Sequence, residues 1–201
     1  MKKKKCKNCG KELRQFKTTD IVCSFICQLK YAESKECQKE HDRLRTLVKT
    51  NEVSKGYPKI LQNLINHMVR LIDKGHSCIT SGDFNCVFHG GHYVSVGANK
   101  TIRYNLLNIF AQSEQDNWHK GGKGSNYGIR LKEVFGTSVR DEIEGLTAKY
   151  PRIALRDNDY IEKILICRRI IKELKEADRV YSTDERIILR REFNNQIGIY
   201  L

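Results

Sequence analysis

Apolar residues recur at three- and four-residue spacing in several stretches of the chain, and this spacing predicts amphipathic helices. The clearest stretch begins near Pro58, a residue suited to a first helical turn, and ends at Gly75. A second stripe runs through residues 159–177. We expect both helices to bury one face, which for the first consists of Ile60, Leu61, Leu64, Ile65, Met68, Val69 and Ile72.

Weaker signals predict further helices. Residues 29–49 are highly charged with a sparse apolar stripe, as in a spacer or a DNA-facing helix. Segments 126–135 and 138–149 are separated by a glycine, and Ser182 with Glu185 forms a capping pair that begins a last helix. Most of the chain is therefore predicted to be helical.

The pattern changes between these helical segments. Residues 86–96 combine aromatic and β-branched residues around two glycines, so we expect a β-hairpin or a bent strand pair there. Residues 102–104 are a further extended candidate, and the glycine-rich stretch 118–125 predicts a loop. The fold class predicted is α+β, mostly helical, with a small β element near the middle of the chain.

Four of the eight cysteines have a spacing that predicts a metal site. Cys6, Cys9, Cys23 and Cys27 form C-x2-C-x13-C-x3-C, which can place four thiolates at the corners of a tetrahedron, as in a structural zinc site. A module of about 30 residues buries too little apolar surface to fold alone, so zinc would stabilise it. Disulfides would need an oxidising compartment, of which the sequence gives no other sign.

The chain is strongly basic and its charge is uneven. It carries 37 Lys and Arg against 24 Asp and Glu, a net charge of +13, and residues 1–50 alone contribute +8. Such a surplus attracts polyanions, nucleic acid before anionic membrane. Candidate DNA contacts in the N-terminal part are Lys2, Lys3, Lys4, Lys5 and Lys7. No apolar run is long enough to cross a bilayer or to form a signal peptide, so we expect a cytoplasmic protein without membrane contact.

The segment 78–136 holds the residues that predict chemistry. His92, Asn108 and a later Asn or His follow the order of an HNH, or ββα-metal, nuclease site. An imidazole can accept the proton of an attacking water, because its pKa lies near neutrality. A neighbouring amide can orient that imidazole. We therefore predict His92 as general base and Asn108 as its orienter.

A divalent cation would complete such a site by neutralising the phosphate and stabilising the leaving oxygen. We expect Asn117 and His119 to open the helix that carries its ligands, with Mg²⁺ or Mn²⁺ as the ion. His89 is a weaker candidate ligand, because residues three apart on a strand face opposite ways. A bulge at the two glycines between His89 and His92 would bring them to one face. A single histidine on a strand is more often structural, so the prediction rests on the ordered set.

Several short motifs occur in order along the chain: Cys6-Lys7-Asn8, Val22-Cys23-Ser24, Gly91-His92-Tyr93, Arg103-Tyr104-Asn105, Asn108-Ile109, Asn117, His119-Lys120 and Val139-Arg140-Asp141. Together they resemble the phage recombination protein NinG (Rap) family over most of the chain. The resemblance implies a structure-specific endonuclease that acts on branched DNA intermediates. It also implies a fold with a small ββα-metal (HNH-like) core and an N-terminal zinc knuckle. Lys120 and Lys123 would add DNA contacts beside that core.

The resemblance also implies a second structural zinc, held in relatives by two C-x2-C pairs that flank the hairpin. Here Cys78 stands at one of these positions, and the other three are occupied by Ser81, Ser113 and Asp116. One cysteine cannot hold zinc, and Cys86 would still leave two ligands missing. We therefore expect this second zinc to be absent and packing to replace it.

These signals predict four regions: 1–30, zinc knuckle with basic tail; 31–56, charged helix or linker; 57–136, nuclease core; 137–201, C-terminal helices. Two departures from the family, Phe110 where a histidine is usual and Lys123 where an asparagine is expected, leave alternatives open. The chain could be a non-catalytic DNA-binding recombination accessory with a degenerate core, or an HNH nuclease with sequence preference. Paired nicking of a DNA junction would favour a homodimer.

Overall fold

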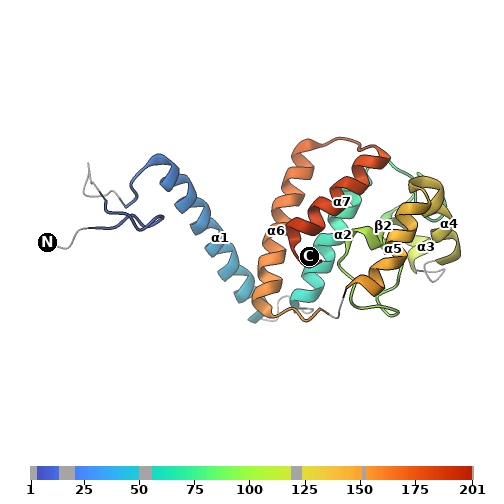
Figure 1. Cartoon of the computed structure of the whole chain (residues 1–201), viewed down its shortest axis with the longest axis horizontal. Coiled ribbons are helices and arrows are strands. Elements are labelled where there is room, and N and C mark those ends of the chain that lie inside the picture. Colours follow the sequence, from blue (N-terminus) through green and yellow to red (C-terminus); the bar gives the residue numbers. More distant parts are fainter. Residues whose placement is uncertain (1–3, 14–20, 50–55, 119–123, 151–152, 201) are drawn as a thin grey trace. The chain divides into compact units, whose positions relative to one another are not determined.

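The computed structural model describes residues 4–13, 21–49, 56–118, 124–150 and 153–200 (Figure 1). The chain divides into two compact units, Met1–Ser54 and Lys55–Leu201. The division falls within the stretch 31–56, for which the sequence predicts a charged helix or linker. No helix in the described part of the chain is both long and apolar enough to cross a membrane.

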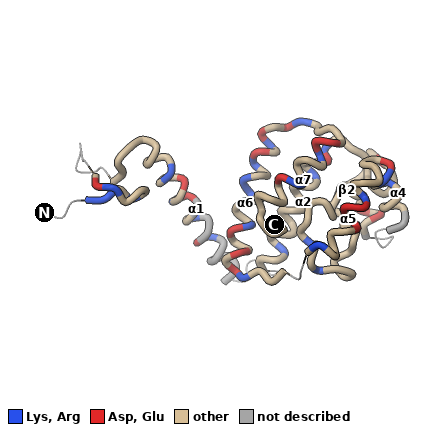
Figure 2. The backbone as a smooth tube through the Cα atoms, viewed as in Figure 1, with Lys and Arg blue, Asp and Glu red and all other residues tan. Residues whose placement is uncertain are grey.

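The first unit combines a short looped segment with the long helix α1 (Phe25–Lys49). The helix begins four residues earlier than the sequence predicts, because the Ser24 hydroxyl accepts a hydrogen bond from the backbone N–H of Cys27 (3.2 Å) and caps the first turn. Basic and acidic residues alternate along α1, as Figure 2 shows, and its mean hydropathy is low. The looped segment is closed by a bridge between Lys5 and Glu12.

The second unit contains a layer of three helices, in which α6 (Asp157–Ala177) packs against both α2 (Gly56–Ile72) and α7 (Thr183–Ile197) (Figure 1). The apolar stripes predicted for α2 and α6 supply much of the buried face. The capping pair predicted for α7 is present, since the Ser182 hydroxyl accepts from the backbone N–H of Glu185 and the Glu185 carboxylate accepts from that of Ser182.

A two-stranded antiparallel sheet packs on α2. Strand β1 (Phe88–His92) pairs with β2 (Ile109–Ser113), from Phe88 opposite Ser113 to His92 opposite Ile109. The prediction of a local strand pair within 86–96 is therefore wrong: this stretch supplies one strand, and residues 102–104 form a turn. The partner of β1 lies beyond a 16-residue connection, and no local pattern indicates such a pairing.

The close fit of β1 against α2 depends on glycine. A Cβ atom at Gly90 would lie 2.8 Å from the side-chain oxygen of Asn66 on α2. A Cβ atom at Gly91 would lie 2.0 Å from the Gln112 side-chain oxygen on the neighbouring strand. Both distances are shorter than any tolerable carbon–oxygen contact, so the Gly90-Gly91 pair lets the strand approach its neighbours.

Short helical elements flank the sheet. The 3₁₀ turn η1 (Leu106–Asn108) precedes β2, and α3 (Glu114–Trp118) follows it directly. Helices α4 (Gly124–Phe135) and α5 (Thr137–Lys149) then pack against each other, and α4 also contacts α7. The second unit is thus mostly helical with a small antiparallel sheet, and strand, strand and helix follow one another along the chain.

A buried ion-pair group ties α2, β2 and α7 together. The carboxylate of Asp73, just after α2, accepts bonds from the Arg190 Nη2 (2.8 Å), from the Arg186 Nε (2.9 Å) and from the backbone N–H of Ala111 (2.7 Å). The Arg190 guanidinium also lies over the Phe110 ring, 4.3 Å from its centroid. Burial alone would raise the pKa of Asp73, but the two guanidinium groups lower it overall.

Candidate functional site

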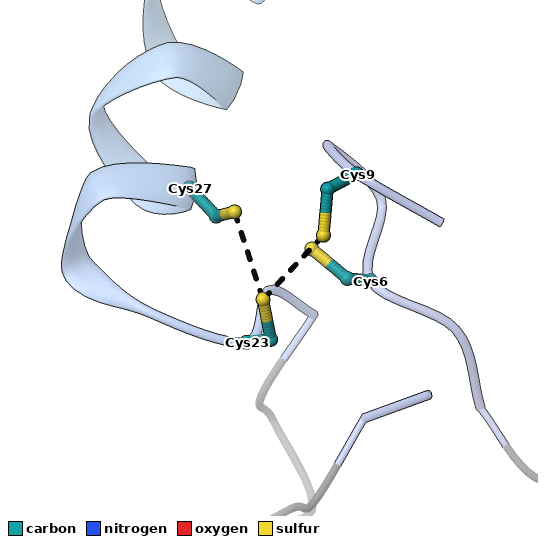
Figure 3. A group of neighbouring side chains, drawn as sticks. All are labelled: Cys6, Cys9, Cys23 and Cys27. Carbon is teal, nitrogen blue, oxygen red and sulfur yellow. Dashed lines mark hydrogen bonds between the residues drawn. The ribbon is translucent and has the colours of Figure 1, made fainter. Parts of the chain in front are cut away.

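The four cysteines of the first unit converge (Figure 3). Cys6 and Cys9 come from the first loop, Cys23 from the approach to α1, and Cys27 from its first turn. Their four Sγ atoms all lie within 4.8 Å of one another, and the Cys9–Cys23 and Cys23–Cys27 pairs are separated by 3.6 Å. The predicted pattern C-x2-C-x13-C-x3-C therefore forms one cluster in space.

This cluster fits a zinc ion. Tetrahedral coordination with Zn–S bonds of about 2.3 Å places the sulfur atoms about 3.8 Å apart, close to the separations observed here. Hydrogen bonds from the backbone N–H of Cys9, and more weakly of Asn8 and Cys23, lower the pKa of the Cys6 thiol to about 6, which favours the thiolate that a metal requires. Hydrogen bonds to Cys9 and Cys27 raise the pKa of the Cys23 thiol to about 12 in the absence of an ion, so the four thiols share the negative charge unevenly. Cys6, Cys9, Cys23 and Cys27 can thus hold a metal ion such as zinc.

The loop is shaped for this purpose by local hydrogen bonds. The backbone N–H of Gly10 donates to the Cys6 carbonyl (2.9 Å), and Gly10 has a φ of +72°, as the predicted tight turn requires. The amide of Asn8 donates to the Cys27 Sγ (3.4 Å). Apolar support is small, because the buried hydrophobic cluster contains only Leu13 and Val22 beside the cysteines among the described residues.

The second candidate site is built around His92, the last residue of β1. Its Nε2 lies 2.8 Å from the backbone oxygen of Arg103, so Nε2 carries the proton and donates it to this carbonyl. The other ring nitrogen, Nδ1, is then left with a lone pair that can accept a proton. Burial, with a smaller contribution from the positive charge of Arg103, lowers the pKa of His92, so the ring is neutral at pH 7.

Asn108 does not orient His92 as predicted. Its side-chain oxygen accepts from the backbone N–H of Val94 (2.9 Å), and its amide donates to the Val94 carbonyl (3.0 Å). The side chain is fully buried and fixes the chain just beyond β1. The imidazole is oriented by the carbonyl of Arg103 instead, a backbone group eleven residues away that no side-chain pattern could have indicated.

The other predicted metal ligands are not gathered at His92. The register from Phe88 to His92 is uninterrupted, without a bulge, so His89 and His92 project from opposite faces of the sheet. Asn117 lies near the end of α3 and does not open a helix. Because α3 follows the Ser113 end of the sheet and His92 lies at the opposite end, Asn117 is not brought to His92. His119 lies outside the described residues.

Helix α4, rather than α3, approaches the His92 end of the sheet. The hydroxyl of Tyr127 donates to the Gly91 carbonyl (2.8 Å) and accepts from the backbone N–H of Phe110 (3.2 Å). A Cβ atom at Gly128 would lie 3.0 Å from the Tyr93 hydroxyl. Phe110, a departure from the family pattern, is fully buried between Tyr127 and Phe135 and is a core residue.

The predicted DNA-binding lysines are described only in part. Lys4, Lys5 and Lys7 are exposed on the loop that carries Cys6. Lys2, Lys3, Lys120 and Lys123 lie outside the described residues. In the part of the chain that the structure describes, the four cysteines are the only group of three or more His, Cys, Asp or Glu side chains close enough to share an ion.

The four positions of the second predicted zinc site also come together. The buried Sγ of Cys78 accepts from the backbone N–H groups of Ser113 (3.1 Å) and Ser81 (3.5 Å) and lies 3.7 Å from the Asp116 carboxylate. The Ser113 hydroxyl accepts from the Asp116 N–H (3.1 Å). Burial opposes ionisation of Cys78, but these donors together lower its pKa. Hydrogen bonds join these positions, and Cys78, Ser113 and Asp116 are buried in the core of the second unit.

The fold and the cysteine cluster define a mostly helical α+β protein with an N-terminal group of four cysteines that can hold a metal ion. The family model described as "Bacteriophage Lambda NinG protein" matches residues 1–178, and the chain belongs to this family. The family predicted from the short motifs is thereby confirmed.

Individual relatives match over a shorter segment. "Protein ninG" of Enterobacteria phage H19B, of Salmonella phage P22 and of Escherichia phage lambda are each 32% identical to the chain over 87 residues. That segment is 43% of this chain and 43% of each relative, so the match spans less than half the length of these proteins. No solved structure matches the chain.

Proposed function

We propose that the protein is a metal-dependent DNA endonuclease that cuts branched recombination intermediates, with His92 as general base. The observation that carries this proposal is the fixed imidazole of His92, at the end of the first strand in a strand–strand–helix succession. Membership of a phage NinG family and a net charge of +13 support DNA as the substrate.

The chemistry follows from the tautomer of His92. With Nε2–H bound to the Arg103 carbonyl, Nδ1 can take a proton from a water that attacks the phosphorus. The carbonyl also stabilises the imidazolium that forms, because it accepts from a stronger donor in that state. Asn108 holds the following backbone through Val94 and so keeps the end of β1 in place.

A divalent cation, Mg²⁺ or Mn²⁺, belongs to this proposal through the family resemblance. The described residues do not supply a set of ligands for it, since neither His89 nor Asn117 is brought to His92. Nicking with and without added Mg²⁺ or Mn²⁺ measures the metal requirement.

Nicking of a synthetic four-way junction by the wild type and by His92→Ala tests the proposal. The substitution should lower the rate about 10²- to 10⁴-fold, which is the usual contribution of a general base. His67→Ala, a histidine of α2 that lies near Lys175 of α6, is the matched control and should cut normally. Equal rates for wild type and His92→Ala, or no cutting with either metal, would refute the proposal.

The pH profile of the same reaction gives a second readout. A general base acts in its neutral form, and burial lowers the pKa of His92 from its usual 6.5. The rate should therefore be constant from neutral pH upward and fall on acidification, with a midpoint below 6.5. A midpoint above 6.5 would assign the base to another group.

The second candidate is a non-catalytic DNA-binding accessory with the same core. It is favoured by the lack of a second convergent group of metal ligands among the described residues. It predicts junction binding that is weakened by salt but is indifferent to His92→Ala and to added metal. A nuclease with sequence preference would instead leave a fixed motif at the nicks mapped on a plasmid.

A further inference from the structure

A cavity of about 170 Å³ lies beside the turn that orients His92. Its wall is formed by the turn around Arg103 and by the segment that leads into α6. Two cationic side chains, Lys100 and Arg103, line it together with the rings of Tyr104 and Tyr160, and no carboxylate is found among the described lining residues. A hollow with two positive charges and no negative one favours an anion.

The Arg103 guanidinium is held in position. Its Nε donates to the side-chain oxygen of Gln62 on α2 (3.1 Å), and its plane lies over the Tyr104 ring, 5.0 Å from the centroid. Tyr104 is itself fixed, since its hydroxyl donates to the Pro58 carbonyl (3.2 Å). A guanidinium that is fixed before binding loses little conformational entropy when an oxyanion arrives.

The two terminal nitrogens of Arg103 remain available. The bond to Gln62 uses Nε alone, and the terminal nitrogens donate to no acceptor among the described residues. Asp159 precedes Tyr160 of the cavity wall but does not line the cavity itself. Its carboxylate accepts from the backbone N–H of Arg156 (2.8 Å) and caps α6. The planar pair of terminal nitrogens matches two oxygens of a phosphate.

Arg103 also links the cavity to His92. Its backbone oxygen accepts the proton of the imidazole Nε2, and its positive charge acts on the same ring. The distance between His92 and an anion bound by the guanidinium is therefore about the length of the Arg103 side chain. A DNA strand whose scissile phosphate meets His92 could place a neighbouring phosphate at Arg103.

We propose that this cavity binds a backbone phosphate of the DNA, with the Arg103 guanidinium as bidentate donor and Lys100 as a second cation. The location of the bound strand beside His92 rests on the proposed nuclease function. The phosphate contact itself does not, because an accessory protein that binds DNA without cutting it would use the same cavity.

The test is the salt dependence of DNA binding by the whole 201-residue chain, purified in the presence of zinc. Fluorescence anisotropy of a labelled four-way junction is measured without Mg²⁺ or Mn²⁺ between about 50 and 200 mM NaCl. Loss of one phosphate contact in Arg103→Gln should make the slope of log K against log salt less negative by about 0.9. Affinity at the lowest salt should fall about tenfold, one good charged contact.

Three further variants make the result specific. Arg103→Lys should keep the slope but bind more weakly, because a lysine retains the charge and loses the bidentate geometry. Lys100→Gln, at an exposed side chain, should make the slope less negative as Arg103→Gln does. Lys132→Gln, exposed on α4, is the matched control and should bind as the wild type does.

A reduced slope in Arg103→Gln and Lys100→Gln supports the phosphate site, whether or not the wild type nicks DNA. If the wild type binds and never cuts, the nuclease proposal fails and the phosphate site stands. Three results would overturn the proposed phosphate site. They are an unchanged salt slope in both variants, a loss of slope and affinity in Lys132→Gln equal to theirs, and a wild type that does not bind the junction. Should Arg103→Gln lower the unfolding midpoint, Lys100→Gln decides.

Discussion

The two units stabilise their cysteine-containing turns in different ways. In the first unit, four Sγ atoms converge with little apolar support, Leu13 and Val22 being the other members of the cluster. In the second, Cys78 sits in a large hydrophobic core and is held by backbone N–H groups and Asp116. A metal is needed where a short segment cannot bury enough surface, and can be given up where a core already fixes the same turns.

Metal removal should give the largest effect. Cys23→Ser, or chelation of the wild type, should abolish metal binding and unfold the looped part of the first unit, since structural zinc contributes about 10–16 kcal/mol of apparent binding energy. Metal content and the amide NMR dispersion of residues 4–13 and 21–27 report this, while the unfolding midpoint of the second unit should stay constant. Cys86→Ser, outside the cluster, is the control and should retain the metal. Retained dispersion in metal-free protein would contradict the comparison.

The counterpart in the second unit is the buried ion-pair group. Asp73→Ala leaves the buried Arg190 unpaired and should lower the free energy of unfolding by about 3–5 kcal/mol. Urea unfolding measures this loss. Arg191 follows Arg190 on α7 and has an exposed partner, Glu142 of α5. Glu142→Ala removes this partner and should change stability by less than about 1 kcal/mol. Similar losses in both variants would show that burial does not set the strength of these pairs.

Acid titration checks the same group by sign. The folded-state pKa of Asp73 is lowered, so its carboxylate adds stability that is complete above the unfolded value of about 3.9 and is lost as the pH falls through the lower folded value. The neutral, buried His92 acts in the same direction, with a loss that begins below its unfolded pKa of about 6.5. Asp73→Ala should flatten only the more acidic part of the stability curve.

A smaller effect is expected when the turns around Cys78 are given the four thiols that the first unit already has. Ser81→Cys, Ser113→Cys and Asp116→Cys together place three further thiols around Cys78 and should raise the zinc content from one to two ions per chain. At free zinc about 100-fold above its dissociation constant, the stability gain is about 2.7 kcal/mol. Ser81→Cys alone should bind no second ion. If the triple variant also gains none, the geometry of these turns is not that of a metal site.

The smallest effect concerns two tyrosines near His92. The Tyr93 hydroxyl donates to Glu144 (2.7 Å), which also accepts from Arg140 (2.8 Å), so Tyr93→Phe should cost less than about 1 kcal/mol. Tyr127→Phe should cost about 1–3 kcal/mol, because its buried hydroxyl bonds β1 and β2 together. Thermal unfolding of both variants separates the two values, and a larger loss for Tyr93→Phe would contradict this ranking.

The candidate sites differ in how far sequence could predict them. The cysteine cluster was predictable in full, because paired spacings place ligands in adjacent turns. His92 was identified as a residue, but its partner was not, since a backbone carbonyl leaves no mark on side-chain pattern. Asn117 was expected to open a helix, but it lies near the end of the short helix α3, which no apolar periodicity indicated.

Sequence alone determined the longer helices and the four-cysteine cluster, since periodicity, caps and short spacings act between residues a few positions apart. The apolar stripes of α2 and α6, the Ser182 cap and the four cysteines all belong to this class. Only the tertiary structure decided that β1 pairs with β2, that Asp73 meets Arg190, and that Arg103 orients His92. These contacts join distant residues, and their free energy depends on burial that exists only once the chain has folded.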